Sequence, residues 1–290
     1  PSYRPSPLLW LASAGNFAVC MSQVSSRLPL LDTAKGLACA AIVAHHLAFY
    51  GPMSDIAQPL APDLMAWLYD YARMAVQIFL VLGGYLAAAS LAPEGVARFD
   101  SAGQQVGKRF VRLVVPYVVA LLVTVLVSAL VRPWFDHPSV PGDPDVAQLI
   151  THALLLHSVA DHESLSAGVW YVAIDFQLFT LSVLAFAAVR ALPQGLPRQR
   201  AAWVGQGAVV AGVAASLWGF NRDAQWDVWA VYFFGAYGLG MMAFWASRAP
   251  RAAGWVVAMA VLGAVALVLD FRGRIALALA TALLLVWALR

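Results

Sequence analysis

Long apolar runs follow one another along most of this chain of 290 residues, and they constrain its fold more than any other feature. A helix of roughly 20 apolar residues is long enough to cross a bilayer. Charged residues are only 11% of the chain, against about 25% in soluble domains. The sequence therefore predicts an all-α, polytopic transmembrane helical bundle in a lipid bilayer. We expect about eight spans, at 30–50, 69–91, 110–132, 168–190, 202–219, 229–247, 253–270 and 275–290.

The segments that connect these runs alternate in charge. One set of alternate segments carries 13 of the 18 Lys and Arg residues, and the other set is rich in Asp. Because Lys and Arg accumulate in cytoplasmic loops, we expect the N-terminus and the present C-terminus to be cytoplasmic. The predicted location is the cell (inner or plasma) membrane. The net charge of +3 follows from these loops and predicts no nucleic-acid partner.

Two segments do not fit the pattern of full spans. Residues 1–29 form a predicted N-terminal tail whose short apolar run, Leu8 to Met21, suits an interfacial helix. Val146 to Ala160 is also apolar and short, and we expect a re-entrant or interfacial helix packed on the bundle. Residues 30–290 are otherwise predicted to form one transmembrane domain, and truncation of that domain at its C-terminal end is left open by the sequence.

The first span, Leu31 to Phe49, carries two charged residues and two histidines. Lys35 and His46 are eleven residues apart, which is three helical turns and roughly 20°, so they share a face about 16 Å apart along the axis. Asp32 lies close to the same face and is a candidate partner of Lys35. His45 lies about 100° round the helix and is expected to meet a neighbouring helix. Polar groups in a span should face a protein interior or a water-filled cavity.

Two further stretches carry candidate functional residues. KRFVR places Arg109 and Arg112 three residues apart, beside Lys108, where two guanidinium groups suit a phosphate and equally suit a membrane anchor. WYVAIDFQLF places Asp175 inside an apolar span, where a carboxylate should be paired or protonated. Its other notable residues are Trp170, at the outer boundary, and Gln177, on nearly the same face as Trp170.

Some residues are expected to serve packing instead. The paired glycines of IFLVLGGYL, at 78–86, predict close helix packing. Neither the cysteines nor the histidines show metal-binding spacing, so no metal and no tightly bound cofactor is expected. Of the histidines on the predicted outer side, His152 and His157 are candidates for lining a vestibule.

Taken together, these stretches resemble the acyltransferase-3 family of integral-membrane acyltransferases. The R/K-x10-H run of that family looks like Lys35 to His46. Its FFVLSGF run and the basic RxxR that follows resemble 78–86 and 109–112, and its W-S-L-x-x-E-Q-F run resembles 170–178. The resemblance covers roughly 27–245. It departs from the family in having Lys at 35, Asp in place of Glu at 175, and eight spans where the family usually has ten.

The resemblance implies transfer of an acyl group, most often acetyl, from cytoplasmic acyl-CoA as co-substrate to a hydroxyl of a glycan or small molecule. Lys108, Arg109 and Arg112 are then expected to bind the donor. Lys35, supported by Asp32, holds the donor or an adjacent carboxylate. A basic pair at the inner face agrees with this assignment, because the phosphates of the donor arrive there.

The expected catalytic residues are His46, Asp175 and Lys35. His46 is either the general base on the acceptor hydroxyl or a transient acyl carrier. Asp175 is expected to orient His46 or the acceptor, with Gln177 in support. The expected acceptor-site residues are Trp170, His45 and His157.

Two other classes of protein remain open from the residues alone. A proton-coupled transporter also needs intramembrane His, Asp and Lys. However, the polar residues here are concentrated in the first four spans, which does not suit paired broken helices in two repeats. A purely structural or receptor-like membrane protein leaves those polar residues without a purpose.

Overall fold

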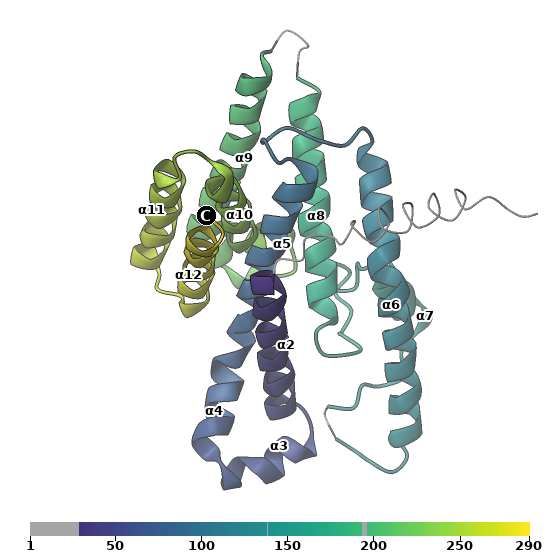
Figure 1. The fold of residues 1–290 in the computed structure, drawn as a ribbon. Helices are drawn as coiled ribbons and strands as arrows, with labels where there is room; N and C mark the ends of the chain where they lie inside the picture. The colour runs from purple at the N-terminus through teal and green to yellow at the C-terminus, as the bar shows by residue number, and fades with distance from the viewer. Residues whose placement is uncertain (1–28, 138, 193–195) are drawn as a thin grey trace, which may run out of the picture.

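The computed structural model describes residues 29–137, 139–192 and 196–290 of the chain. Figure 1 shows a bundle of helices joined by loops, the longest of them on either side of α7, with no strand in the described ranges. This confirms the predicted all-α class. The predicted tail, with its apolar run Leu8 to Met21, lies outside the described residues.

The eight predicted spans all coincide with helices. The α-helices are α2 (Pro29–Phe49), α3 (Pro52–Ala57), α4 (Pro62–Asp70), α5 (Val76–Leu91), α6 (Ala102–Val131), α7 (Val146–Ala153), α8 (Val169–Arg190), α9 (Arg198–Trp218), α10 (Ala230–Arg248), α11 (Ala253–Leu269) and α12 (Gly273–Ala288). Short 3-10 turns are η1 (Gln58–Leu60), η2 (Ala72–Ala75), η3 (Phe220–Arg222) and η4 (Ala224–Trp226). In the described chain, five helical segments are long and apolar enough to cross a membrane, or six if α2 and the helix bent 88° from it count as one span. The apolar helices α11 and α12 are shorter, with 17 and 16 residues.

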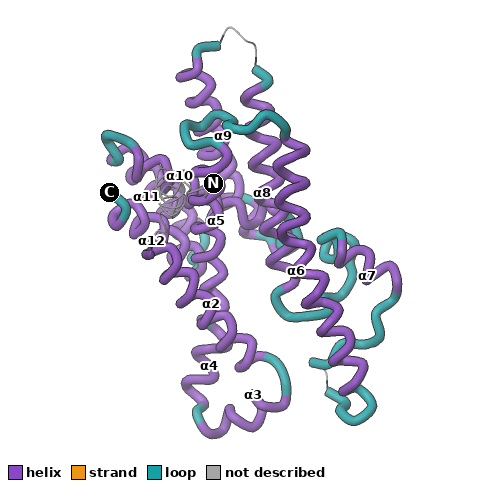
Figure 2. The backbone as a smooth tube through the Cα atoms, turned by 45° about the vertical axis from the view of Figure 1, so that its right-hand side comes forward, coloured by secondary structure: helices purple, strands orange, loops and turns teal. Residues whose placement is uncertain are grey.

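The segment between the first two spans differs from the prediction, because it is helical where a loop was expected. Figure 2 shows α3 and α4 as helices at one extremity of the molecule. Pro59 is the second residue of η1 and Pro62 is the first residue of α4, positions at which the fixed φ and missing N–H of proline cost little. The 3-10 turn η2 then joins α4 to α5, so 62–91 forms one long, interrupted helical segment.

The two ends of the bundle keep the sides that the charge pattern predicts. At one end, which we name the basic end, lie the α5–α6, α8–α9 and α10–α11 connections. There Arg190 contacts Asp100 at 3.0 Å and Arg198 contacts Glu94 at 2.9 Å. At the other end, named the acidic end, the backbone N–H of Gly51 donates to Ser139 Oγ at 3.0 Å. These contacts tie neighbouring loops of the same predicted side together. Which end faces the cytoplasm stays a prediction.

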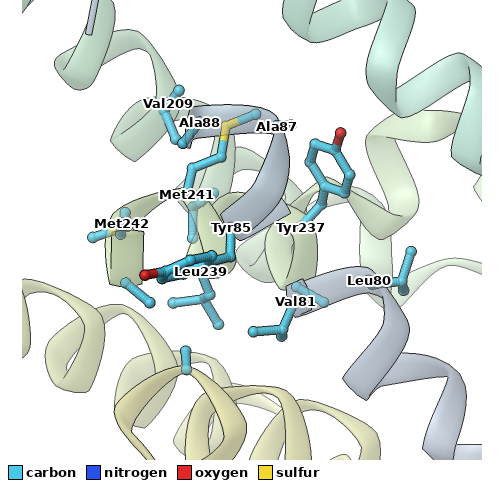
Figure 3. Close-up of a cluster of buried hydrophobic side chains, with 14 of the residues drawn as sticks. Leu80, Val81, Tyr85, Ala87, Ala88, Val209, Tyr237, Leu239, Met241 and Met242 are labelled. Atoms are coloured by element: carbon cyan, nitrogen blue, oxygen red, sulfur yellow. The ribbon is translucent and has the colours of Figure 1, made fainter. Parts of the chain in front are cut away.

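The core is centred on α5 and α10. Figure 3 shows Val81 and Tyr85 of α5 beside Leu239 and Tyr237 of α10. A Cβ on Gly84 would lie 1.7 Å from the carbonyl oxygen of Tyr237, and one on Gly240 would lie 1.9 Å from that of Val81. The two backbones therefore touch at two reciprocal glycines, as the paired glycines predict.

The helix α2 lies at the edge of this core, beside α4, η2 and α5 (Figure 1). Its buried residues are Leu31, Ala38 and His45, spaced by seven. That spacing makes one narrow stripe along the helix. Large apolar residues such as Leu37 and Leu47 are exposed on the other faces, as suits a helix that borders lipid.

Candidate active site

A cavity of about 820 Å³ lies at the acidic end of the bundle. Its wall is built from helix ends on that side: the last turn of α2, the first turn of α8, the turn before α10 and the first residues of α12. Residues of η2 and of the start of α5 form a further part of the wall. Aromatic rings line much of it, among them Tyr50, Phe79, Tyr171 and Phe233. A cavity of this size can admit a small-molecule or sugar-sized ligand.

His46 is half-buried in the wall of this cavity. Its Nδ1 is buried and has no hydrogen-bond partner among the described residues. Its Nε2 faces Gly168, where an added Cβ would lie 3.8 Å away. Gly168 adopts a φ of +80° and precedes the first residue of α8, a backbone conformation that glycine favours. Glycine is required here by the backbone conformation, which brings the start of α8 against the His46 ring.

His45 turns away from its neighbour, as the 100° step between them predicts. Its Nδ1–H donates to the carbonyl oxygen of Leu68 in α4 at 3.1 Å. The ring is 8% exposed and borders the same cavity. His45 therefore anchors α2 to α4, and His46 is left for the cavity.

Lys35 and Asp32 do not fit the predicted arrangement. The cavity reaches along α2 only to Ile42, so Lys35 does not line it. Lys35 is half-buried and Asp32 is exposed, and the ion pairs of the described chain include none between them. The prediction that Lys35 and His46 line one cavity is wrong in this structure. A shared helix face does not bring two side chains together when about three turns separate them.

Asp175 pairs with Arg109 instead of His46. The Arg109 Nη2 donates to Asp175 Oδ2 at 2.5 Å, across the α6–α8 contact. The guanidinium also lies 5.1 Å from the centre of the Phe179 ring. Asp175 is 8% exposed, so its charge needs this partner. Within the described chain its carboxylate is hydrogen-bonded to Arg109 and not to His46, and it does not line the cavity, which corrects the expectation that Asp175 orients His46 or the acceptor.

This pair also separates the predicted donor-binding residues. Arg109 turns into the bundle, whereas Lys108 and Arg112 are exposed on α6. Neither exposed cation takes part in an ion pair within the described ranges. None of the three lines the cavity. The predicted clamp of two free guanidinium groups is thus reduced to one free guanidinium and one ammonium.

Trp170 and Gln177 both shape the cavity. Trp170 lies in its wall, with its ring 5.7 Å from that of Phe233. The side-chain amide of Gln177 donates to the carbonyl oxygen of Val228 at 3.2 Å, and its Oε1 accepts from the N–H of Ala230 at 2.9 Å. Gln177 therefore holds the turn before α10, which forms part of the wall.

His157 does not line the cavity, which corrects its predicted place in the acceptor site. It is fully buried and stacks on His152, with ring centroids 4.2 Å apart. Both of its ring nitrogens lack a hydrogen-bond partner within the described chain. Burial, followed by the charges of His152 and His162, lowers the pKa of His157 to about 4. The next residue, Ser158, borders the cavity.

Sequence reasoning missed the charged residues of the cavity wall, namely Arg73, Arg272, Arg274 and Asp227. A signal for three of them was present. Five of the 18 Lys and Arg residues fall on the predicted outer side, against the general trend, and they are Arg73, Arg132, Arg222, Arg272 and Arg274. Cations that break the positive-inside pattern need another explanation, and three of these five line the cavity.

Comparison with known families gives one match. The sequence model of the Acyl_transf_3 family, described as an acyltransferase domain, matches residues 28–290. No curated protein and no solved structure matches the chain. Within the described ranges, no group of three His, Cys, Asp or Glu residues is placed to hold a metal ion.

Proposed function

Because this chain belongs to the Acyl_transf_3 family of membrane acyltransferases, we propose that it transfers an acyl group from acyl-CoA to a hydroxyl of a glycan or small molecule. Acetyl is the expected group. The observation that carries the proposal is His46, an imidazole with a free buried Nδ1 in the wall of a cavity large enough for an acceptor.

In the proposed reaction, His46 acts as the general base. Its ring accepts the proton of the acceptor hydroxyl while the oxygen attacks the thioester carbon. The new ester C–O bond forms, the C–S bond breaks, and the imidazolium returns its proton to the leaving thiolate of CoA. Trp170 borders the same cavity and is assigned to the acceptor. Histidine suits both proton transfers because it titrates near neutral pH.

The donor is assigned to the basic end, which the charge pattern predicts to be cytoplasmic. Lys108 and Arg112 are exposed there and are proposed to bind its phosphates. Lys35, half-buried on α2 between that end and His46, is proposed to contact the donor along its path. The pair of Arg109 with Asp175 lies on α6 and α8 along the same route, and we assign it to holding those two helices together.

The proposal is tested with membranes that contain the wild type, His46→Ala or His137→Ala. His137 lies at the same end of the bundle without lining the cavity, which makes its variant a matched control. The membranes are incubated with acetyl-labelled acetyl-CoA, and label that mild alkali releases from hydroxyl-bearing material is counted. We expect alkali-labile label with the wild type and His137→Ala and none with His46→Ala. Equal labelling by all three would remove His46 from the mechanism.

The same samples separate the base from an acyl carrier. If His46 carries the acyl group, label remains on the wild-type protein when acceptor is withheld, and hydroxylamine releases it. With a general base, no such label accumulates. Labelled free acetate is the donor control, because it should give no product if the thioester is required. A transporter would give no esterified label with any variant.

A further inference from the structure

The cavity beside His46 carries more positive charge than the loop-charge pattern predicts for the acidic end of the bundle. Its wall holds three guanidinium groups, from Arg73, Arg272 and Arg274, against the one carboxylate of Asp227. All three arginines lie on the side of the chain that the charge pattern assigns to the acidic end. The positive-inside rule does not explain these three arginines. Their positive charge therefore favours binding of an anion in the cavity.

One of the three arginines is part of the scaffold. Arg272 donates from Nη1 to Asn221 Oδ1 at 2.5 Å and from Nη2 to the carbonyl oxygen of Leu217 at 2.9 Å. Its Nε lies 3.3 Å from Asp270 Oδ2. Its side chain is only 10% exposed. Arg272 therefore fixes the α11–α12 connection to the end of α9 and has few donors left for a ligand.

The other two arginines retain free donors. Arg73 uses its Nε to donate to the carbonyl oxygen of Asp70 at 3.3 Å, and its two terminal nitrogens have no hydrogen-bond partner in the described chain. Arg274 uses Nη2 to donate to the carbonyl oxygen of Asn221 at 3.2 Å, and its guanidinium lies 5.0 Å from the centre of the Tyr232 ring. Stacking and one hydrogen bond fix Arg274 in place and leave its other nitrogens available. Such preorganised guanidinium groups bind oxyanions well.

The start of α12 adds to this positive field. Gly273, its first residue, borders the cavity, and Arg272 before it provides no side-chain cap. The first N–H groups of a helix have no partner within the helix and favour negative charge. Aromatic rings, including Trp170 and Tyr232, form the apolar remainder of the wall, and such rings offer broad faces to a flat or cyclic ligand.

We propose that the acceptor is a hydroxylated ring compound that carries an oxyanion, held by Arg73 and Arg274 while its hydroxyl faces His46. This inference rests on the proposed function, because it names the acceptor class of the same site. A carboxylate, a sulfate or a phosphate supplies the required chemistry. The oxyanion orients the ring, so that one hydroxyl out of several meets the imidazole.

Binding is tested by thermal stabilisation of the purified protein in detergent. The probes are glucose, glucuronate and glucose 6-phosphate, each at the same concentration, with CoA as a separate probe. The variants are Arg73→Gln/Arg274→Gln and, as the matched control, Arg222→Gln, which removes an exposed arginine of the same end that does not line the cavity. A ligand that binds only the folded state raises the melting temperature.

We expect glucuronate, glucose 6-phosphate or both to stabilise the wild type and Arg222→Gln by several degrees more than glucose does. The two charged sugars distinguish a carboxylate from a phosphate. In Arg73→Gln/Arg274→Gln this difference should fall to the level of glucose, while stabilisation by CoA is retained, which also shows that the variant is folded. Loss of the CoA response in that variant would assign the arginines to the donor and overturn the inference.

The inference also fails if the wild type responds equally to charged and neutral sugars, or if the double variant keeps the charge-dependent response. Either result leaves the proposed function standing as long as acetyl transfer still depends on His46. Conversely, a charge-dependent response without any His46-dependent transfer would support an anion site and remove the proposed reaction. The two failures are therefore distinguishable.

Discussion

The α5–α10 pair and the helix α2 are built in opposite ways. In the first, two backbones touch at Gly84 and Gly240, and 89% of the residues in the most apolar stretch of α10 are buried. In the second, a narrow stripe of buried residues holds a helix whose other faces are exposed. The cavity lies where α2 meets the core. Stability is therefore concentrated in one region and the candidate chemistry in the other.

The polar groups follow the same division. The charges of Arg109 and Asp175 are paired between α6 and α8, although Arg109 Nε has no hydrogen-bond partner in the described chain. His46 Nδ1 also has no partner there, but its ring lies in the wall of the cavity. A buried charge that is paired contributes to structure, and removing its partner is costly. A polar group that is left open toward a cavity is available for chemistry.

The largest expected effect on stability comes from a substitution in the α5–α10 contact. Gly84→Ala places a Cβ 1.7 Å from the carbonyl oxygen of Tyr237, so the α5–α10 backbones must separate. We expect a loss of at least about 3 kcal/mol and little folded protein. The matched control is Gly36→Ala on α2, where nothing lies within 4 Å of the added Cβ. The measurement is the yield of monodisperse protein in size-exclusion chromatography. Equal yields from both variants would contradict the packing described for the core.

The next effect tests whether the buried ion pair is structural. Arg109→Ala leaves the Asp175 carboxylate buried without a partner, and we expect a loss of about 2–3 kcal/mol, below the value for a fully buried pair because the Arg109 side chain is 29% exposed. Replacing both residues, as Arg109→Leu/Asp175→Leu, should restore most of the thermal stability in detergent. Arg112→Ala is the control, because its side chain is exposed and free of ion pairs in the described chain. If Arg109→Ala melts like the wild type, the pair does not hold α6 to α8.

A third prediction concerns His157, a buried imidazole outside the cavity. Its pKa is lowered to about 4, against about 6.5 for an unfolded chain. Above pH 6.5 the His157 ring is neutral in both the folded and the unfolded protein, so its titration does not change the free energy of unfolding. As the pH falls from 6.5 to 4, only the unfolded state binds the proton, so stability falls and then levels off below 4.

This difference corresponds to a loss of up to about 3 kcal/mol. His157→Phe keeps an aromatic ring and removes the titration. The variant should therefore lose less thermal stability than the wild type between pH 7.5 and 4.5, as measured by melting in detergent. Parallel pH profiles for the two proteins would show that His157 does not contribute.

The smallest expected effect lies at the basic end. Arg112→Ala should raise the KM for acyl-CoA by about threefold to tenfold without changing kcat, because it removes binding made equally in the ground and transition states. Arg200→Ala, an exposed cation of the same end on α9, is the control and should leave both constants unchanged. An unaltered KM in Arg112→Ala would leave this residue as a membrane anchor only.

The sequence was sufficient for the eight long apolar helices and for the end of the bundle at which their connections lie, since apolar length and loop charge are local properties. It was not sufficient for α3 and α4, which were expected to be a loop, or for α7, which ends at Ala153 and not at Ala160. The divergence of His45 and His46 also followed, because a step of 100° is fixed by helix geometry. The partner of Asp175 could not be predicted, because it depends on the register between α6 and α8. For the same reason, the 16 Å between Lys35 and His46 could not be judged against a cavity whose depth is set by other helices.

The arginines of the cavity wall could be noticed in the sequence but not placed in space. Arg272 and Arg274 stand out in the sequence as cations on the wrong side, but nothing local shows that they meet α2 and α8 across the bundle. His157 was equally ambiguous, because an apolar segment with two histidines can turn them outward or bury them as a stack. Tertiary contacts decide both cases.

The most direct test of the central claim is a single-turnover measurement on purified protein. Wild type, His46→Ala and His137→Ala are mixed with labelled acetyl-CoA and acceptor, quenched at intervals, and compared per mole of folded protein. We expect His46→Ala to transfer acetyl at least about 100-fold more slowly, with the melting temperature and CoA binding of the wild type, and His137→Ala to match the wild type. A His46→Ala protein that transfers acetyl at the wild-type rate would contradict the claim that the imidazole in this cavity carries the reaction.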